Sequence, residues 1–171
     1  MSLKKICFIL SVLFFTSSSN ATEINSISRD NKINFYTGMF DFSDHGQKSP
    51  LIGIQHQDKD LNRDTFLGNI SPVTGAFMTT KGLAGYIYTG VQAHYNLKNL
   101  NITPSFTPGL YTNGKSKNLG HPIEFKTEIQ ISLDLSKNSE IGFSYNHMSN
   151  AQIGKHNPGS NSYMFNFFKS F

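Results

Sequence analysis

Charge, cysteine and long apolar runs are all scarce in this sequence of 171 residues. Charged residues make up 15% of the chain, against about 25% in typical globular proteins. The one cysteine, Cys7, lies in the N-terminal segment, so the rest of the chain offers no thiol for a disulfide, for cysteine catalysis or for a thiolate metal site. Beyond that segment no apolar run is long enough for a membrane helix, and no basic stretch with interleaved aromatic residues indicates nucleic-acid binding. The composition therefore argues against a helical membrane protein and against a nucleic-acid-binding protein.

The first 21 residues have the features of a signal peptide. Lys4 and Lys5 form a basic start, residues 6–15 form an apolar run too short to cross a bilayer, and residues 19–21 (Ser-Asn-Ala) form a small-x-small cleavage site. We predict cleavage after Ala21 and export of residues 22–171. The alternative is an uncleaved N-terminal anchor, which the shortness of the apolar run disfavours. Loss of the two lysines lowers the formal net charge from +4 to about +2.

Aromatic residues and glycine are abundant, with 15 Phe and 14 Gly, while the mean hydropathy is negative. The stretch Ile123–Leu135 alternates between two kinds of side chain. Its odd positions are Ile123, Phe125, Thr127, Ile129, Ile131, Leu133 and Leu135, and its even positions are Glu124, Lys126, Glu128, Gln130, Ser132 and Asp134. This alternation predicts a strand with one apolar and one polar face. The strand is longer than the usual globular strand of about 5–6 residues and suits a tilted strand that crosses a membrane.

The same pattern, in weaker form, predicts further strands along the chain. The expected strands lie near 33–42, 51–58, 66–80, 83–95, 100–111, 122–135, 139–149 and 161–171. Three short turns (58–64, 97–99 and 136–139) alternate with three longer loops (43–50, 112–121 and 150–160). Such alternation and an even strand number are typical of bacterial outer-membrane barrels. We therefore predict an all-β fold, an eight-stranded antiparallel transmembrane β-barrel, in which the link at 80–82 and the strand before it fit the pattern least well.

The C-terminus supports a membrane barrel. Tyr163, Phe165, Phe167 and Phe171 share one face of the last strand, and Lys169 interrupts that face close to the chain end. A lipid-facing Lys costs about 2–4 kcal/mol at mid-bilayer but about 0–1 kcal/mol near the interface, so we expect Phe171 to lie at the periplasmic rim. The alternative is a soluble lipocalin-like barrel with its apolar face inward, which the aromatic C-terminus and the low charge disfavour.

A candidate catalytic pair lies at the end of the strand expected at 139–149. His147 and Ser149 continue the apolar, lipid-facing row of that strand, where polar side chains are unfavourable without a partner. Residues two apart on a strand project from the same side, about 7 Å apart at the backbone, so that an imidazole can reach the hydroxyl and activate it. Asn161, on the returning antiparallel strand, is expected opposite His147, where its carbonyl can accept the second imidazole N–H. The alternative is that His147 and Ser149 are polar residues at the membrane rim without a catalytic role.

These residues belong to a wider motif. It consists of His147-x-Ser149-Asn150-Ala151, then Asn157-Pro158-Gly159, with Tyr111, Gly114, Leu119-Gly120 and Glu124-Phe125 before it. The combination resembles the signature of PagL-type lipid A 3-O-deacylases, and the resemblance is densest from about Tyr111 to Phe171.

The resemblance implies an ester hydrolase in the outer membrane of a Gram-negative bacterium that removes the 3-O-linked acyl chain of lipid A. It also implies Ser149 as nucleophile, His147 as general base and Asn150 as oxyanion-hole donor, with backbone N–H groups near Ala151 and Gln152 completing the hole. The implied partners are lipid A or lipopolysaccharide and the membrane; a homodimer is left open. We assign no metal and no cofactor.

One position departs from the family pattern. The acidic residue expected as the third member of the triad falls at Asn161, which can orient an imidazole but cannot stabilise its charged form by an opposite charge. Glu124 lies near the same rim, yet its parity places it on the inner face. Two hypotheses follow, an active deacylase and a catalytically impaired family member that serves as a structural or interaction barrel. A third, a small porin or adhesin, is disfavoured because eight strands leave an interior filled by side chains and the loops are short.

Overall fold

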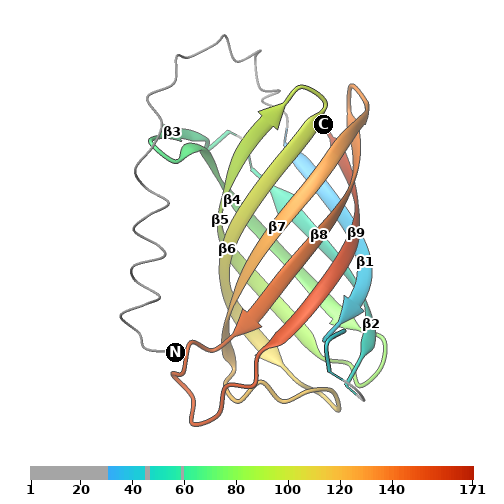
Figure 1. The fold of residues 1–171 in the computed structure, drawn as a ribbon, viewed down its shortest axis with the longest axis vertical. Helices are drawn as coiled ribbons and strands as arrows, with labels where there is room; N and C mark the ends of the chain where they lie inside the picture. The colour runs from blue at the N-terminus through green and yellow to red at the C-terminus, as the bar shows by residue number, and fades with distance from the viewer. Residues whose placement is uncertain (1–30, 45–46, 59) are drawn as a thin grey trace.

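Nine antiparallel strands form the fold, and all of them except β3 close into a barrel (Figure 1). The computed structural model describes residues 31–44, 47–58 and 60–171, so the predicted signal peptide and its cleavage site lie outside the described residues. The strands are β1 (Lys32–Phe40), β2 (Ser49–Gln57), β3 (Arg63–Thr65), β4 (Gly68–Thr79), β5 (Gly85–Leu97), β6 (Leu100–Thr112), β7 (Ile123–Ser136), β8 (Ser139–Ser149) and β9 (Ser160–Ser170). Neighbours in the chain pair with one another, β9 pairs with β1, and β2 pairs with β4 to close the ring. The predicted eight-stranded antiparallel barrel is confirmed.

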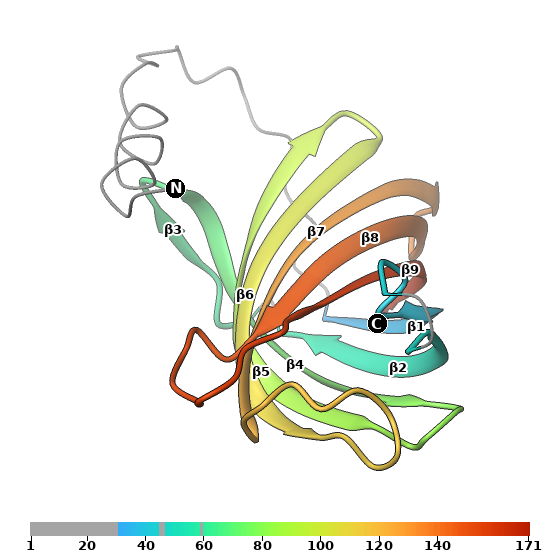
Figure 2. The same cartoon turned by 60° about the horizontal axis from the view of Figure 1, so that its bottom comes forward.

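The loops separate into two ends of the barrel as the sequence predicted, except that the segment predicted as a short turn at 58–64 runs into an additional strand, β3. Residues 41–44, 47–48, 113–122 and 150–159 belong to longer connections at one end, which Figure 2 brings forward, whereas 98–99 and 137–138 are two-residue turns at the other. The strand predicted near 66–80, which fitted the pattern least well, is β4, and the short link at 80–84 lies at the long-loop end. It can be short because Gly82 and Leu83 both adopt positive φ angles, 75° and 52°, which turn the chain tightly. In outer-membrane barrels the longer loops face outside, so we call this end the extracellular rim.

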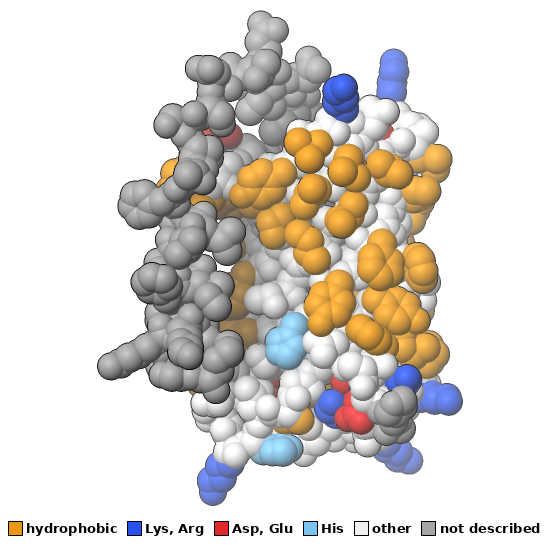
Figure 3. All heavy atoms as spheres, in the orientation of Figure 1, with side chains coloured by type: hydrophobic (Ala, Val, Ile, Leu, Met, Phe, Trp, Pro, Cys, Tyr) orange, Lys and Arg blue, Asp and Glu red, His pale blue; other side chains and the backbone are white. Residues whose placement is uncertain are grey.

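The apolar face of the strands points outward. In β7 the side chains of Ile131, Leu133 and Leu135 are 46–63% exposed, whereas Glu124 and Lys126 are 0% and 2% exposed. Figure 3 shows apolar side chains spread over the wall, with Lys and Arg side chains gathered toward the two ends. A soluble lipocalin-like barrel would have the opposite polarity. Among the described residues no helix is long and apolar enough to cross a membrane.

Polar side chains fill the middle of the interior. Lys126 lies 3.1 Å from the Glu128 carboxylate and places its ammonium 4.0 Å from the centre of the Tyr88 ring. Gln130 and Asn146 donate further hydrogen bonds to Glu128, at 2.6 and 3.3 Å. Closely spaced hydrogen-bonded groups in a low-dielectric interior reinforce one another. The barrel is therefore a packed core rather than a wide channel, which disfavours a porin.

An apolar cluster closes the interior below the extracellular rim. It contains Phe40, Leu51, Phe77, Ala84, Tyr86, Tyr111, Leu119 and Met148, together with Tyr36, Tyr88 and Met164. Leu119 enters from the loop between β6 and β7 and is fully buried. That loop is also tied to the loop between β1 and β2 by Lys117, whose ammonium lies 2.9 Å from Asp41 and 3.1 Å from Asp44. These contacts fix the loops that surround the candidate site.

Candidate active site

His147 and Asn161 face each other on the outer wall at the extracellular rim. Both residues have the outward parity of their strands, and the pairing of β8 with β9 places them directly opposite. His147 Nδ1 lies 2.8 Å from Asn161 Oδ1, which is hydrogen-bonding distance. When the amide oxygen is the acceptor, the imidazole carries its proton on Nδ1 and leaves Nε2 free to accept one. The expected juxtaposition of these two side chains is present.

Two further side chains hold Asn161. The Tyr145 hydroxyl donates to Asn161 Oδ1 at 2.9 Å, and Asn161 Nδ2 donates to the Ser43 hydroxyl at 3.1 Å. The amide thus has its oxygen toward His147 and its nitrogen toward the loop between β1 and β2. Sequence reasoning missed both partners. Tyr145 shared the parity of His147 and could have been found, whereas Ser43 lies in a loop where no period indicates direction.

Ser149 ends β8 two residues beyond His147, on the same side of the strand. It is half-buried and pairs with Phe125 on β7. Within the part of the chain that the structure describes, no hydrogen bond joins its hydroxyl to His147. Catalytic hydrogen bonds are often long before substrate binds and shorten in the complex. Residues two apart on a strand are separated by about 7 Å at the backbone, a gap that an imidazole side chain can cover.

The imidazole of His147 packs against Gly159, in the loop between β8 and β9. A Cβ atom on Gly159 would lie 3.0 Å from His147 Cε1 and 3.5 Å from Nε2. The φ angle of Gly159 is +64°, a region that disfavours other residues. Two features therefore favour glycine at position 159: its positive φ angle and the space that the imidazole occupies.

Asn150 is fully buried and organises the same loop. Its side-chain Nδ2 donates to Leu119 O and to His156 O, both at 2.8 Å, while its Oδ1 accepts from Gln152 N at 2.9 Å. Asn157 Oδ1 accepts from the backbone N of Asn150 at 3.0 Å. The side-chain N–H groups of Asn150 and the backbone N–H of Gln152 thus already donate hydrogen bonds inside the protein in this conformation.

Ala151 differs from its two neighbours. Its backbone N–H makes no hydrogen bond with any described residue, and both Ala151 and Gln152 adopt positive φ angles, 51° and 66°. Strained backbone of this kind often occurs at functional sites. Ala151 N–H is therefore the one predicted oxyanion donor that is available.

Aromatic side chains surround the site on the membrane side. The Phe42 ring centre lies 5.4 Å from that of Tyr163 and 6.2 Å from that of Tyr145, and Phe143 lies 6.0 Å from Tyr163. Phe125 stacks on Phe106 beside Ser149, with ring centres 5.9 Å apart. A polar pair bordered by such an apolar wall suits an amphipathic molecule that enters from the membrane. Glu124 points inward and is fully buried, as its parity predicted, so it is remote from the outward pair.

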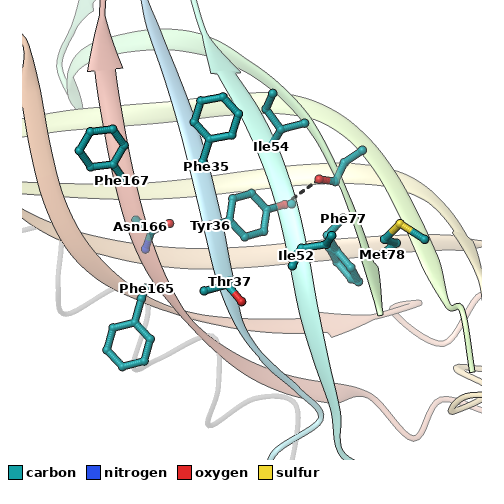
Figure 4. A pocket seen from close by; sticks show the side chains of 12 residues that line it. Phe35, Tyr36, Thr37, Ile52, Ile54, Phe77, Met78, Phe165, Asn166 and Phe167 are labelled. Carbon is teal, nitrogen blue, oxygen red and sulfur yellow. Dashed lines mark hydrogen bonds between the residues drawn. The ribbon is translucent and has the colours of Figure 1, made fainter. Parts of the chain in front are cut away.

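A shallow apolar hollow of about 770 Å³ lies farther along the wall, over β9, β1, β2 and β4 (Figure 4). The Thr37 side chain is small and lies between Phe165 and Ile52 in the paired row. Phe35 and Phe167 border the hollow in the next row. The Tyr36 hydroxyl donates to Ala76 O at 3.1 Å beneath it. The residues that line the hollow carry no charge, so its surface is mainly apolar.

Comparison with known proteins supplies the family. Residues 34–170 match the family model described as lipid A 3-O-deacylase (PagL). The chain belongs to this family. The fold agrees, because the crystal structure of the outer membrane enzyme PagL superposes with a TM-score of 0.64 at 16% identity, covering 82% of this chain and 99% of that one. A structure from the de novo design of transmembrane β-barrels gives a TM-score of 0.55 at 8% identity, covering 86% and 100% of the two chains.

No curated protein matches the chain. Membership of the lipid A 3-O-deacylase family and the barrel fold imply the outer membrane of a Gram-negative bacterium. The resemblance first noted in the motif around His147 is thereby confirmed at the level of the family.

Proposed function

We propose that the protein is an outer-membrane serine esterase that removes the 3-O-linked acyl chain of lipid A. The observation that carries the proposal is the hydrogen bond of 2.8 Å between His147 and Asn161 on the lipid-facing side of the extracellular rim, in a chain of the lipid A 3-O-deacylase family. Lipid A lies in the outer leaflet, and a site that faces lipid at that rim meets its substrate without extracting it from the membrane.

The reaction proceeds by two acyl transfers. Ser149 Oγ attacks the ester carbonyl while its proton moves to His147 Nε2, and the carbonyl oxygen becomes an oxyanion. The tetrahedral intermediate collapses, the bond between the acyl carbon and the sugar 3-oxygen breaks, and the imidazolium gives its proton to that leaving oxygen. Water then attacks the acyl-serine with the same base, releasing a fatty acid and restoring Ser149.

The oxyanion needs donors close to the developing charge. The free backbone N–H of Ala151 supplies one. Asn150 and Gln152 contribute as the sequence predicted only if the loop rearranges when substrate binds, because their N–H groups are otherwise engaged. In the observed conformation their part is to hold Ala151 in its left-handed backbone geometry.

A second candidate function is a structural or interaction barrel without catalysis. Two observations favour it: the third member of the triad is an amide, and His147 and Ser149 share no hydrogen bond within the described chain. Mass spectrometry of lipid A after incubation with refolded wild type, Ser149→Ala and Asn161→Glu separates the two. Loss of one 3-hydroxyacyl chain in wild type but not in Ser149→Ala supports the esterase. Loss of the acyl chain only with Asn161→Glu indicates a site that has lost its activity, and no loss with any protein supports the structural role.

A homodimer stays a prediction, which light scattering in detergent would test.

A further inference from the structure

A short hairpin leaves the barrel at the periplasmic end. β3 pairs with the first residues of β4, from Arg63 with Ile70 to Thr65 with Gly68. β4 pairs with β2 only from Val73 onward, whereas residues 69–72 stay paired with β5, so the hairpin extends the β4–β5 edge beyond the end of β2. Figures 1 and 2 show this β3–β4 hairpin (Arg63–Ile70) standing out to the side of the wall rather than continuing upward along the barrel axis.

The tip of the hairpin is apolar and uncovered. Phe66 is 90% exposed, and its neighbour Leu67 is 42% exposed. Leu61, just before β3, is 54% exposed. The two other described turns at this end, 98–99 and 137–138, contain only Lys and Asn. Apolar side chains gathered at an exposed tip are unfavourable in water and indicate a contact surface.

Local hydrogen bonds hold the tip in one conformation. Thr65 Oγ1 donates to Gly68 O at 2.9 Å, and Asn69 Nδ2 donates to Asp64 Oδ1 at 2.9 Å. Gly68 has a φ angle of +97°, which few other residues adopt. Phe66 is therefore presented by a preformed turn, and its ordering cost is already met before any contact is made.

The tip is also fastened to the lipid-facing wall. The Tyr95 hydroxyl donates to Leu67 O at 2.6 Å. Tyr95 belongs to the outward row of β5, which includes Ile87 and Val91 and continues to Leu97, which is 60% exposed. The apolar belt thus extends past the level of Tyr95, and the tip lies beside that belt. Tyrosine is a typical residue of the membrane interface, where its ring is apolar and its hydroxyl polar.

We propose that the β3–β4 hairpin is an interfacial anchor that inserts Phe66 and Leu67 among the acyl chains of the inner leaflet. The occupant is a phospholipid leaflet, because the hairpin projects sideways from the wall and its tip is bonded to a lipid-facing tyrosine. Arg63 and Asp64, on the strand that leads to the tip, remain among the headgroups. The anchor lies at the rim opposite the candidate active site, so the proposal does not depend on catalysis.

The absence of tryptophan from the sequence gives a clean test. Phe66→Trp, Val91→Trp and Asn138→Trp each introduce a single reporter, at the tip, in the lipid-facing wall and in an exposed periplasmic turn. Each protein is refolded into phosphatidylcholine vesicles with and without lipids brominated on their acyl chains. We expect Phe66→Trp to match Val91→Trp, with blue-shifted emission, quenching by brominated lipid and protection from acrylamide.

Two outcomes would overturn the proposal. Emission of Phe66→Trp like that of Asn138→Trp, quenched by acrylamide and not by brominated lipid, would mean that the tip lies in water. Blue-shifted emission that brominated lipid does not quench, and that depends on the protein-to-lipid ratio, would mean that the tip contacts another protein copy instead. Circular dichroism of all three variants confirms that each barrel is folded.

Discussion

Replacement of Asn161 by Asp tests how the amide serves His147. The two side chains have nearly the same shape, so the change exchanges the amide for a charged acceptor at the 2.8 Å contact with His147 Nδ1. The Tyr145 hydroxyl still donates to it, and the Ser43 hydroxyl, which now accepts from Asn161, can turn and donate instead. The geometry of the site is therefore preserved.

The magnitude follows from the orientation of the amide. A neutral hydrogen bond contributes about 0.5–1.5 kcal/mol net and one to a charged group about 1.5–3 kcal/mol. The gain of about 1–1.5 kcal/mol as the imidazolium forms corresponds to a rise in kcat of about five- to thirteenfold. In serine proteases the reverse change lowers kcat by about 10⁴, because the amide presents its nitrogen and imposes the wrong tautomer. That large factor does not apply here, since Asn161 already presents its oxygen.

The assay is the initial rate of fatty-acid release from lipid A in mixed micelles, for wild type, Asn161→Asp and Asn161→Leu. Asn161→Leu removes the acceptor at similar volume and should lower kcat. A rise in kcat near 10⁴ in Asn161→Asp would refute the orientation, because it would mean that the wild-type amide turns its nitrogen toward His147. An unchanged rate in both variants would refute any role of Asn161 in orienting the base.

Three further outcomes follow from named contacts. Tyr145→Phe removes one hydrogen bond to the third member of the triad and should lower kcat by about two- to tenfold, with KM unchanged; an altered KM alone would instead place Tyr145 in substrate binding. Gly159→Ala forces a Cβ to within 3.0 Å of the His147 ring at a positive φ angle, so activity in the same assay should fall sharply while circular dichroism still shows a folded barrel. Lys126→Met leaves Glu128 buried without its partner and should lower the free energy of unfolding by about 3–5 kcal/mol, measured by urea titration. The double variant Lys126→Met/Glu128→Gln should recover much of that loss. If Lys126→Met and the double variant were equally stable, the buried Glu128 carboxylate would not need Lys126.

Periodicity accounts for what the sequence could predict. Alternation gave the eight barrel strands and their lipid-facing rows, and parity alone brought Asn161 opposite His147. It failed for β3, because three residues are too few to show a period, and residues 58–64 were expected only as a turn. It also failed for Ser43 and for the contacts of Asn150, because loop residues follow no parity. Asn150 donates to Leu119 O, 31 residues away in the chain, and only the assembled loops reveal that bond.

The two faces of β8 contribute to different properties of the protein: the inward residues to stability and the outward residues to the candidate site. The even residues Ser144, Asn146 and Met148 point inward and join the buried network and the apolar cluster, whereas Tyr145 and His147 point outward and meet Asn161. A substitution on the outer row leaves the inner contacts intact, so catalysis can be lost without unfolding the barrel. An amide at the third position of the triad is therefore compatible with a stable fold in either functional state. For this reason the deacylation rate of wild type against Ser149→Ala, rather than any measurement of stability, distinguishes a working esterase from a barrel that has retained only its structure.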